Sequence, residues 1–199
     1  MIRASRVVAS VAALGVAALV YMVAFTGPRD LAAYPEPEDS PYRLPFPDGV
    51  PHLCAQGNRG VLTHRGDLEY AYDFAMPAGS PVHAARAGEV IEVDVSRDGI
   101  GNFRGNRIRI RHEDGSVAVY AHLAHGGSAV AQGERVAQGQ FIGSSGTTGR
   151  SLYPHLHFQV DRDDRSFAIS FGDVPEDHGV PRAGSWYTAR AAAPALPAP

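Results

Sequence analysis

Two histidines separated by one residue are the strongest candidates for chemistry in this sequence. His155 and His157 lie in the segment HLHFQV (155–160). In a β-strand, side chains at positions i and i+2 point to the same face, so the two imidazoles would lie side by side, with the apolar residues between and after them facing a core. Such a pair suits a divalent metal ion, or one metal ligand beside one proton carrier. Two surface histidines are the alternative.

Two further residues add to this pair. His122 lies in YAHL (120–123), at the end of a predicted strand, and Asp73 interrupts an otherwise apolar strand in YAYDFAMP (70–77). An ionised carboxylate is costly in apolar surroundings unless it is paired, hydrogen-bonded or bound to a metal. Asp73 is therefore a candidate metal ligand, with a hydrogen-bonded structural aspartate as the alternative.

The elements that position these residues are predicted to be short strands. The chain contains 22 Gly and 15 Pro, a turn-rich composition, and the segments 89–95, 107–111, 116–123 and 155–160 alternate apolar and polar residues. Asp114-Gly115 is a typical two-residue hairpin turn. The sequence therefore predicts an all-β fold with an antiparallel β-sheet core and Gly-rich loops, preceded by an N-terminal apolar helix.

One alternating segment has arginine at every second position. Arg107, Arg109 and Arg111 flank two isoleucines. A row of this kind suits a phosphate or carboxylate ligand, but the solvated outer face of a strand is the favoured interpretation.

The ends of the chain differ from its middle. Two arginines precede an uncharged apolar run over 7–26, which is long enough to cross a bilayer. Residues 1–26 are therefore predicted to be a signal anchor, with a cleaved signal peptide as the alternative. The Pro-rich residues 27–48 are expected to form an extended tether, whose last part could pack on the domain. The domain itself is predicted over 49–186 and a disordered tail over 187–199.

Charge and cysteine content exclude other classes. Hydrophobic residues make up 44% of the chain, and its formal charge of −3 gives no reason to expect a nucleic-acid partner. The single cysteine, Cys54, excludes an intrachain disulfide and a four-cysteine zinc site, and it is predicted to be a buried structural thiol.

Three segments together resemble a known family. YAYDFAMPAGSPVHAARAGEV (70–90), VYAHL (119–123) and VAQGERVAQGQFIGSSGTTGRSLYPHLHF (130–158) look like the lysostaphin/LytM-type zinc metallopeptidases, which are peptidoglycan endopeptidases. The resemblance covers about residues 56–161. It implies a β-sheet core that holds one Zn²⁺ ion in a groove, with the Gly-rich loop 143–149 as a wall, and hydrolysis of peptide bonds in bacterial cell-wall crosslinks.

The resemblance also implies roles for the four candidate residues. By motif position, Asp73 and His157 would be zinc ligands. His122 and His155 would be the catalytic histidines, which handle protons and stabilise the transition state.

The remaining zinc ligand departs from the family pattern. The usual first motif is a histidine four residues before the aspartate, where this chain has Glu69. His64 lies nine residues before Asp73, and the pattern resembles a branch of the family with the histidine displaced in this way. A hairpin around residues 65–67 would let His64 approach the same metal. His64 is the predicted third ligand, Glu69 is the substitute, and a site that binds no metal is the third possibility.

The predicted function is an exported zinc metallo-endopeptidase that acts on peptidoglycan peptides. It would work in the bacterial cell envelope, outside the cytoplasm, either secreted or anchored in the membrane through residues 7–26. One alternative is a non-catalytic envelope protein of the same fold that binds cell wall or activates another hydrolase. Another is a zinc peptidase that acts on protein substrates.

Overall fold

The computed structural model describes residue 27, residues 30–101 and residues 104–190. This part contains eleven strands and four 3₁₀ helices, and none of its helices is long and apolar enough to cross a membrane. The predicted apolar helix over 1–26 lies outside the described residues. The elements are η1 (Leu31–Ala33), η2 (Pro37–Asp39), β1 (Pro51–Gln56), η3 (Gly66–Leu68), β2 (Tyr72–Ala75), β3 (Pro81–His83), β4 (Gly88–Asp94), β5 (Asn106–Arg111), β6 (Val117–Ser128), β7 (Arg135–Val136), β8 (Phe141–Ser145), β9 (His155–Arg162), β10 (Arg165–Ser166), η4 (Asp177–Gly179) and β11 (Trp186–Thr188).

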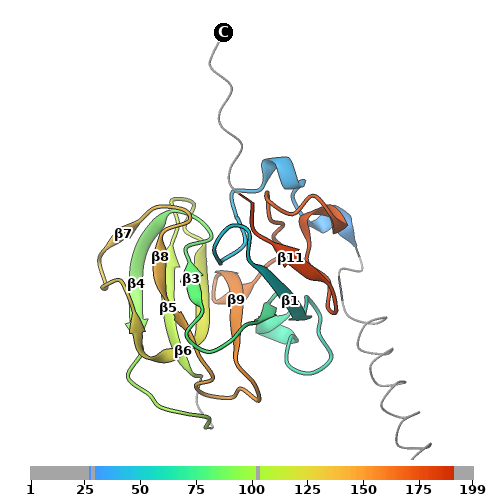
Figure 1. Cartoon of the computed structure of the whole chain (residues 1–199). Helices are drawn as coiled ribbons and strands as arrows, with labels where there is room; N and C mark the ends of the chain where they lie inside the picture. The colour runs from blue at the N-terminus through green and yellow to red at the C-terminus, as the bar shows by residue number, and fades with distance from the viewer. Residues whose placement is uncertain (1–26, 28–29, 102–103, 191–199) are drawn as a thin grey trace, which may run out of the picture.

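These strands form one antiparallel sheet, as the alternating segments predict. The strand order is β11-β1-β2-β9-β6-β5-β4-β7, while β8 pairs with both β3 and β6, and β10 pairs with β9. Figure 1 shows β1 and β11 on one side of β9 and the larger group, β3 to β8, on the other. The sheet therefore brings early, middle and late parts of the chain together around β9.

The four predicted strands correspond to β4, β5, β6 and β9. The Gly-rich segment 143–149 differs from the prediction, because its first three residues belong to β8 and only the rest is a loop. Val82 pairs with Gly143, and Ser145 pairs with Leu123 of β6. Glycine is required at position 143 of this strand because the backbone of Gly127 passes close by: a Cβ on Gly143 would lie 2.4 Å from the Gly127 carbonyl oxygen.

Strand β9 sits at the centre of the sheet and is buried on both faces. Its apolar residues Leu156, Phe158 and Val160 are fully buried in the core. Burial of side chains of this size stabilises the fold by about 1.5–3 kcal/mol each. The residues between them face the other way, and Asp73 of β2 and Ala121 of β6 lie directly opposite His157.

Several residues in the described part of the Pro-rich segment pack against the domain. Tyr34, Tyr42, Leu44 and Phe46 are all buried in the core, and the backbone N–H of Leu44 donates to the Asp173 carboxylate at 2.9 Å. An extended chain can dock in this way because every second side chain points to the same side.

The C-terminal end of the domain also reaches further than the predicted boundary at residue 186. Strand β11 runs to Thr188 and pairs with β1. Tyr187 and Ala189 belong to the core. Residues 191–199 of the predicted tail lie outside the described part.

Candidate metal centre

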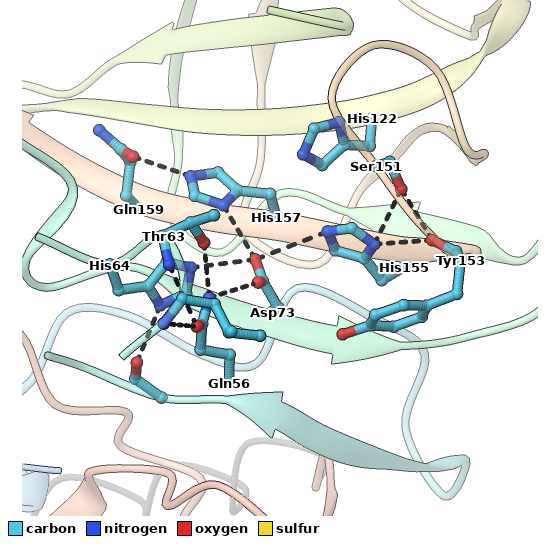
Figure 2. Close-up of polar contacts among 12 residues, drawn as sticks. Gln56, Thr63, His64, Asp73, His122, Ser151, Tyr153, His155, His157 and Gln159 are labelled. Carbon is cyan, nitrogen blue, oxygen red and sulfur yellow. Dashed lines mark hydrogen bonds and ion pairs between the residues drawn. The ribbon is translucent and has the colours of Figure 1, made fainter. Parts of the chain in front are cut away.

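Three side chains from three elements converge at one point in the structure. His64 comes from the loop after β1, Asp73 from β2 and His157 from β9. Asp73 Oδ1 lies 3.2 Å from His64 Nε2 and 2.9 Å from His157 Nδ1. One ligand atom from each residue lies within 4.8 Å of the others, and Figure 2 shows the two rings pointing at the carboxylate. This is the only such group of three or more metal-ligand side chains among the described residues.

The hydrogen bonds around these side chains determine which atoms carry protons. His64 Nδ1 lies 2.8 Å from the Gly57 carbonyl oxygen, which can only accept, so Nδ1 carries the proton and Nε2 offers a lone pair. When His157 is neutral and donates from Nε2 to Gln159 Oε1 at 2.9 Å, its lone pair is on Nδ1. A protonated Nδ1 instead donates to Asp73 Oδ1 at 2.9 Å, so a cation at this position would replace that proton. His64 Nε2 is buried without a hydrogen-bond partner in the described structure. Three converging lone pairs on one carboxylate and two imidazoles fit a divalent cation, and this donor set is one that zinc uses.

The structure brings His64, rather than Glu69, to Asp73. The Glu69 carboxylate instead pairs with the Arg59 guanidinium at 3.0 Å, and its side chain is about one-third exposed. The chain between His64 and Asp73 turns through the 3₁₀ helix η3 (Gly66–Leu68), so the expected hairpin around residues 65–67 is not what forms. Gly66 has a φ of +60°, a conformation that glycine adopts without steric cost.

A buried chain of polar groups continues behind His157. Gln159 Oε1 accepts from His157 Nε2, and Gln159 Nε2 donates to Asp161 Oδ1 at 2.5 Å. All three residues lie on the same face of β9, and each is less than one-tenth exposed. Partners of this kind hold a metal-binding imidazole in one orientation and one tautomer.

Two more histidines lie beside this cluster with one ring nitrogen unprotonated. His122 Nδ1 donates to the Thr148 carbonyl oxygen at 2.7 Å, and His155 Nδ1 donates to the Tyr153 carbonyl oxygen at 2.8 Å. The two ring centroids are 4.7 Å apart. His155 Nε2 faces Asp73 Oδ1 at 3.7 Å. Each ring can therefore accept a proton at Nε2 next to the candidate metal position.

The backbone at His122 adopts a left-handed conformation to place this ring. Its φ is +63°, which is strained for a residue with a side chain and is typical of functional sites. Thr148 supports the conformation because its hydroxyl donates to the Leu123 carbonyl oxygen at 2.8 Å. A Cβ on Gly105 would lie 2.9 Å from His122 Nδ1 and 2.6 Å from the Thr148 carbonyl oxygen, so glycine is needed at position 105.

The electrostatics of the cluster follow from burial and from the shared carboxylate. Burial alone raises the pKa of Asp73, but the charges and hydrogen bonds of His64 and His157 outweigh it and hold that pKa well below its usual range. Burial likewise lowers the pKa of His157, but the hydrogen bond with Asp73 reverses the shift and raises it. Asp73 is therefore a buried anion, and a cation in the cluster would neutralise it.

The pKa values of the two flanking histidines, His122 and His155, are lowered, whereas that of His157 is raised. Burial lowers the pKa of His122 to about 4, with a further contribution from His157 and His155. Burial also lowers the pKa of His155. Both rings are therefore neutral at pH 7, as a proton acceptor must be.

Several residues of the site had no part in the sequence prediction. Gln159 and Asp161 continue the two-residue period that groups His155 with His157, so the pattern His-x-His-x-Gln-x-Asp contained the signal. Gln56 donates from Nε2 to Asp73 Oδ2 at 3.0 Å, and no local pattern indicates this contact because it depends on how β1 pairs with β2.

The other histidines and the cysteine lie elsewhere. Cys54 is fully buried, as predicted. The remaining histidines are outside the cluster: His52 and His112 are buried with a bond to a backbone carbonyl, His83 packs on Phe141, and His125 and His178 lie beside acidic side chains.

Comparison with known proteins identifies the family of the chain. The model of peptidase family M23 matches residues 67–169, a range that contains Asp73, His122, His155 and His157 and begins after His64. The peptidoglycan DD-endopeptidase ShyA of Vibrio cholerae is 32% identical over 146 residues, which is 73% of this chain and 31% of ShyA. Lysostaphin of Staphylococcus simulans is 41% identical over 95 residues, which is 47% of this chain and 18% of lysostaphin. The matched region thus spans less than one-third of either relative.

A solved structure supports the same fold. The catalytic domain of the prophage-encoded M23 protein EnpA from Enterococcus faecalis, solved as a mutant, superimposes with a TM-score of 0.50 at 24% identity, covering 67% of this chain and 98% of that one. The family match covers more than half of the sequence, and the resemblance noted in the three motif segments is confirmed. The chain belongs to peptidase family M23.

Proposed function

We propose that this protein is an exported zinc metallo-endopeptidase that hydrolyses peptide bonds in bacterial peptidoglycan crosslinks. The observation that carries the proposal is the convergence of three lone pairs, from His64 Nε2, Asp73 Oδ1 and His157 Nδ1, beside two neutral histidines. The names of two relatives, the peptidoglycan DD-endopeptidases ShyC and ShyA of Vibrio cholerae, support the substrate class. In this proposal residues 7–26 export the chain or anchor it, and the domain works in the cell envelope.

In this mechanism His64, Asp73 and His157 hold the zinc ion. Zinc, when bound, supplies a Lewis acid that polarises the scissile carbonyl and acidifies a water molecule. His155 Nε2 accepts a proton from the attacking water, because its ring is neutral and its other nitrogen is held by the Tyr153 carbonyl oxygen. The proton then passes to the leaving amine as the C–N bond breaks, so the products are a carboxylate and an amine.

In this proposal His122 is the second catalytic histidine, and its ring lies beside that of His155. Its ring is oriented by the Thr148 carbonyl oxygen, and its Nε2 is positioned to hydrogen-bond either the leaving group or, when protonated, the developing oxyanion. A neutral ring with a pKa of about 4 takes up a proton only as negative charge develops nearby.

The experiment measures zinc content and wall hydrolysis on the full chain. We expect about one zinc per chain in the wild type and in Glu69→Ala, and none in His64→Ala or His157→Ala. Purified peptidoglycan treated with the wild type should release fragments with new peptide termini, identified by mass spectrometry. Zinc-free protein under metal-replete conditions would contradict the proposal.

Two other outcomes would redirect the function. A zinc-loaded protein that binds wall but releases no fragments would favour the non-catalytic envelope protein. Cleavage of unfolded protein substrates without cleavage of wall would favour a peptidase of protein substrates.

A further inference from the structure

We propose that Gln56 is a positioning residue that fixes the loop of His64 and the carboxylate of Asp73 to each other. The inference rests on the proposed zinc site and deepens it. It addresses how His64, which lies on a loop nine residues before Asp73, is held at the candidate metal position.

The side-chain amide of Gln56 makes four hydrogen bonds at once. Its Nε2 donates to Asp73 Oδ2 at 3.0 Å and to Thr63 Oγ1 at 2.7 Å. Its Oε1 accepts from the backbone N–H of Leu62 at 3.2 Å and of Thr63 at 3.4 Å. One half of the amide therefore holds the carboxylate, and both halves hold the residues directly before His64, as Figure 2 shows.

A strand bulge and the backbone of a neighbouring loop position the side chain of Gln56. It is the last residue of β1 and pairs with Asp73 across a bulge in the β1–β2 ladder, and bulges commonly redirect a side chain. Gln56 is only 4% exposed. A Cβ on Gly60 would lie 2.3 Å from Gln56 Cγ, so the loop backbone passes directly over the side chain and leaves room only for glycine.

The contacts leave the metal-facing atoms free. Gln56 donates to Oδ2 of Asp73, so Oδ1 is the carboxylate oxygen that faces His64 and His157. His64 is held separately by Gly57, whose carbonyl oxygen takes the Nδ1 proton. An amide is the group that meets these demands, because it donates to a carboxylate with one atom and accepts from backbone N–H groups with the other.

The main test replaces Gln56 by methionine, which keeps the side-chain length and removes the hydrogen bonds. We expect Gln56→Met in the full chain to bind zinc about 10–100-fold more weakly than the wild type, measured by competition with a chelator. In the zinc-free protein, the amide protons of Leu62 and Thr63 should exchange with solvent faster. A purely structural side chain would lower the melting temperature and leave the zinc affinity unchanged.

A matched control is available outside the site. Gln140 also donates from Nε2 to a carboxylate, Glu134 at 3.2 Å, and accepts at Oε1 from a backbone N–H, that of Ala137 at 3.0 Å. Gln140→Met should leave zinc affinity unchanged. If Gln56→Met does not fold, Thr63→Val removes one of the four bonds and should weaken zinc binding roughly two- to tenfold, the effect of one hydrogen bond.

The outcomes separate this inference from the proposed function. A wild type that binds no zinc overturns both. A wild type that binds zinc, with Gln56→Met or Thr63→Val within twofold of it and with unchanged exchange at residues 62–63, overturns the role of Gln56 alone.

Discussion

Strands β5 and β9 follow the same alternating pattern, yet their polar faces have opposite environments. On β5, Arg107 and Arg109 lie at the surface, about one-quarter exposed, and both pair with Glu92 of β4. On β9, the corresponding positions hold His155, His157, Gln159 and Asp161, all nearly closed off from solvent. The pattern identifies side chains that share a face, and the segments that cover a face decide whether it becomes a surface or a site.

The covering segments explain the difference in energetics. Exposed ion pairs of the β5 type contribute about 0–1 kcal/mol each, since water screens them. Polar groups buried as on β9 must satisfy one another, because a buried group without a partner costs about 1–3 kcal/mol. The β9 row therefore depends on each member having its partner, and substitutions there should have far larger effects than on β5.

The largest effect among the predictions is expected at His155. In His155→Ala the proposed zinc ligands remain, so zinc content should stay near one per chain, while kcat on peptidoglycan fragments should fall about 10²–10⁴-fold because the proposed proton acceptor is lost. The measurement is turnover beside zinc analysis of the same sample. Arg109→Ala, the corresponding change on β5, should leave both values unchanged. Loss of zinc in His155→Ala would move this residue into the ligand set.

The second prediction concerns Gln159. Gln159→Leu keeps the approximate volume of the side chain but removes the acceptor for His157 Nε2, so the imidazole is free to change tautomer. Zinc affinity should fall about 10–100-fold. Nitrogen-15 NMR of the zinc-free protein should show His157 shifting from the form protonated at Nε2 towards a mixture. An unchanged tautomer with unchanged zinc affinity would show that the buried row of β9 is not coupled to the metal.

These two strands also show how far the sequence alone can go. The shared face of His155 and His157 is predictable because side-chain alternation is a local property of a strand. The outward row of arginines is predictable for the same reason. Whether each face is covered depends on loops far away in the sequence, and for this reason the sequence leaves two surface histidines as an alternative.

The contacts that the sequence could not indicate are all non-local. Gln56 meets Asp73 only because β1 pairs with β2 across a bulge. The approach of His64 depends on a 3₁₀ turn whose geometry no spacing rule describes. The Pro-rich residues 27–48 show the same limit: their last part is expected to be able to pack on the domain, and Tyr42 and Phe46 are buried there, but nothing in the sequence indicates that Tyr34 is also buried in the core.

The third prediction uses pH to test what stabilises the β5 side of the molecule. His112 directly follows β5, is buried, and contacts the Tyr42 ring at 5.6 Å between centroids. Burial lowers its pKa, and Arg86 adds to the shift. Below about pH 6.5 the unfolded chain therefore takes up a proton that the folded chain does not, so stability is full above that pH and falls as the pH drops.

The measurement is urea unfolding of the zinc-free protein between about pH 7 and about pH 5, where one such histidine changes the free energy of unfolding by at most about 1.4 kcal/mol per pH unit. His112→Phe should show a smaller fall over this range. Parallel curves for the two proteins would mean that His112 does not contribute. In that case the buried His112 would contribute no more to the pH dependence of stability than the surface arginines of β5.

The smallest effect is expected at Glu92, where the surface row of β5 has its partner. Glu92→Gln removes the carboxylate shared by Arg107 and Arg109, and it should lower the free energy of unfolding by about 0.2–1 kcal/mol, less at high salt. Zinc affinity and hydrolysis should not change. Urea unfolding at low and high salt gives the measurement, with Gln159→Leu as its counterpart on β9. If Glu92→Gln destabilised the fold as strongly at high salt as at low salt, the β5 row would stabilise the sheet by packing rather than by screened charge. The rows on β5 and β9 would then differ only in how much they stabilise the fold, and not in the kind of interaction.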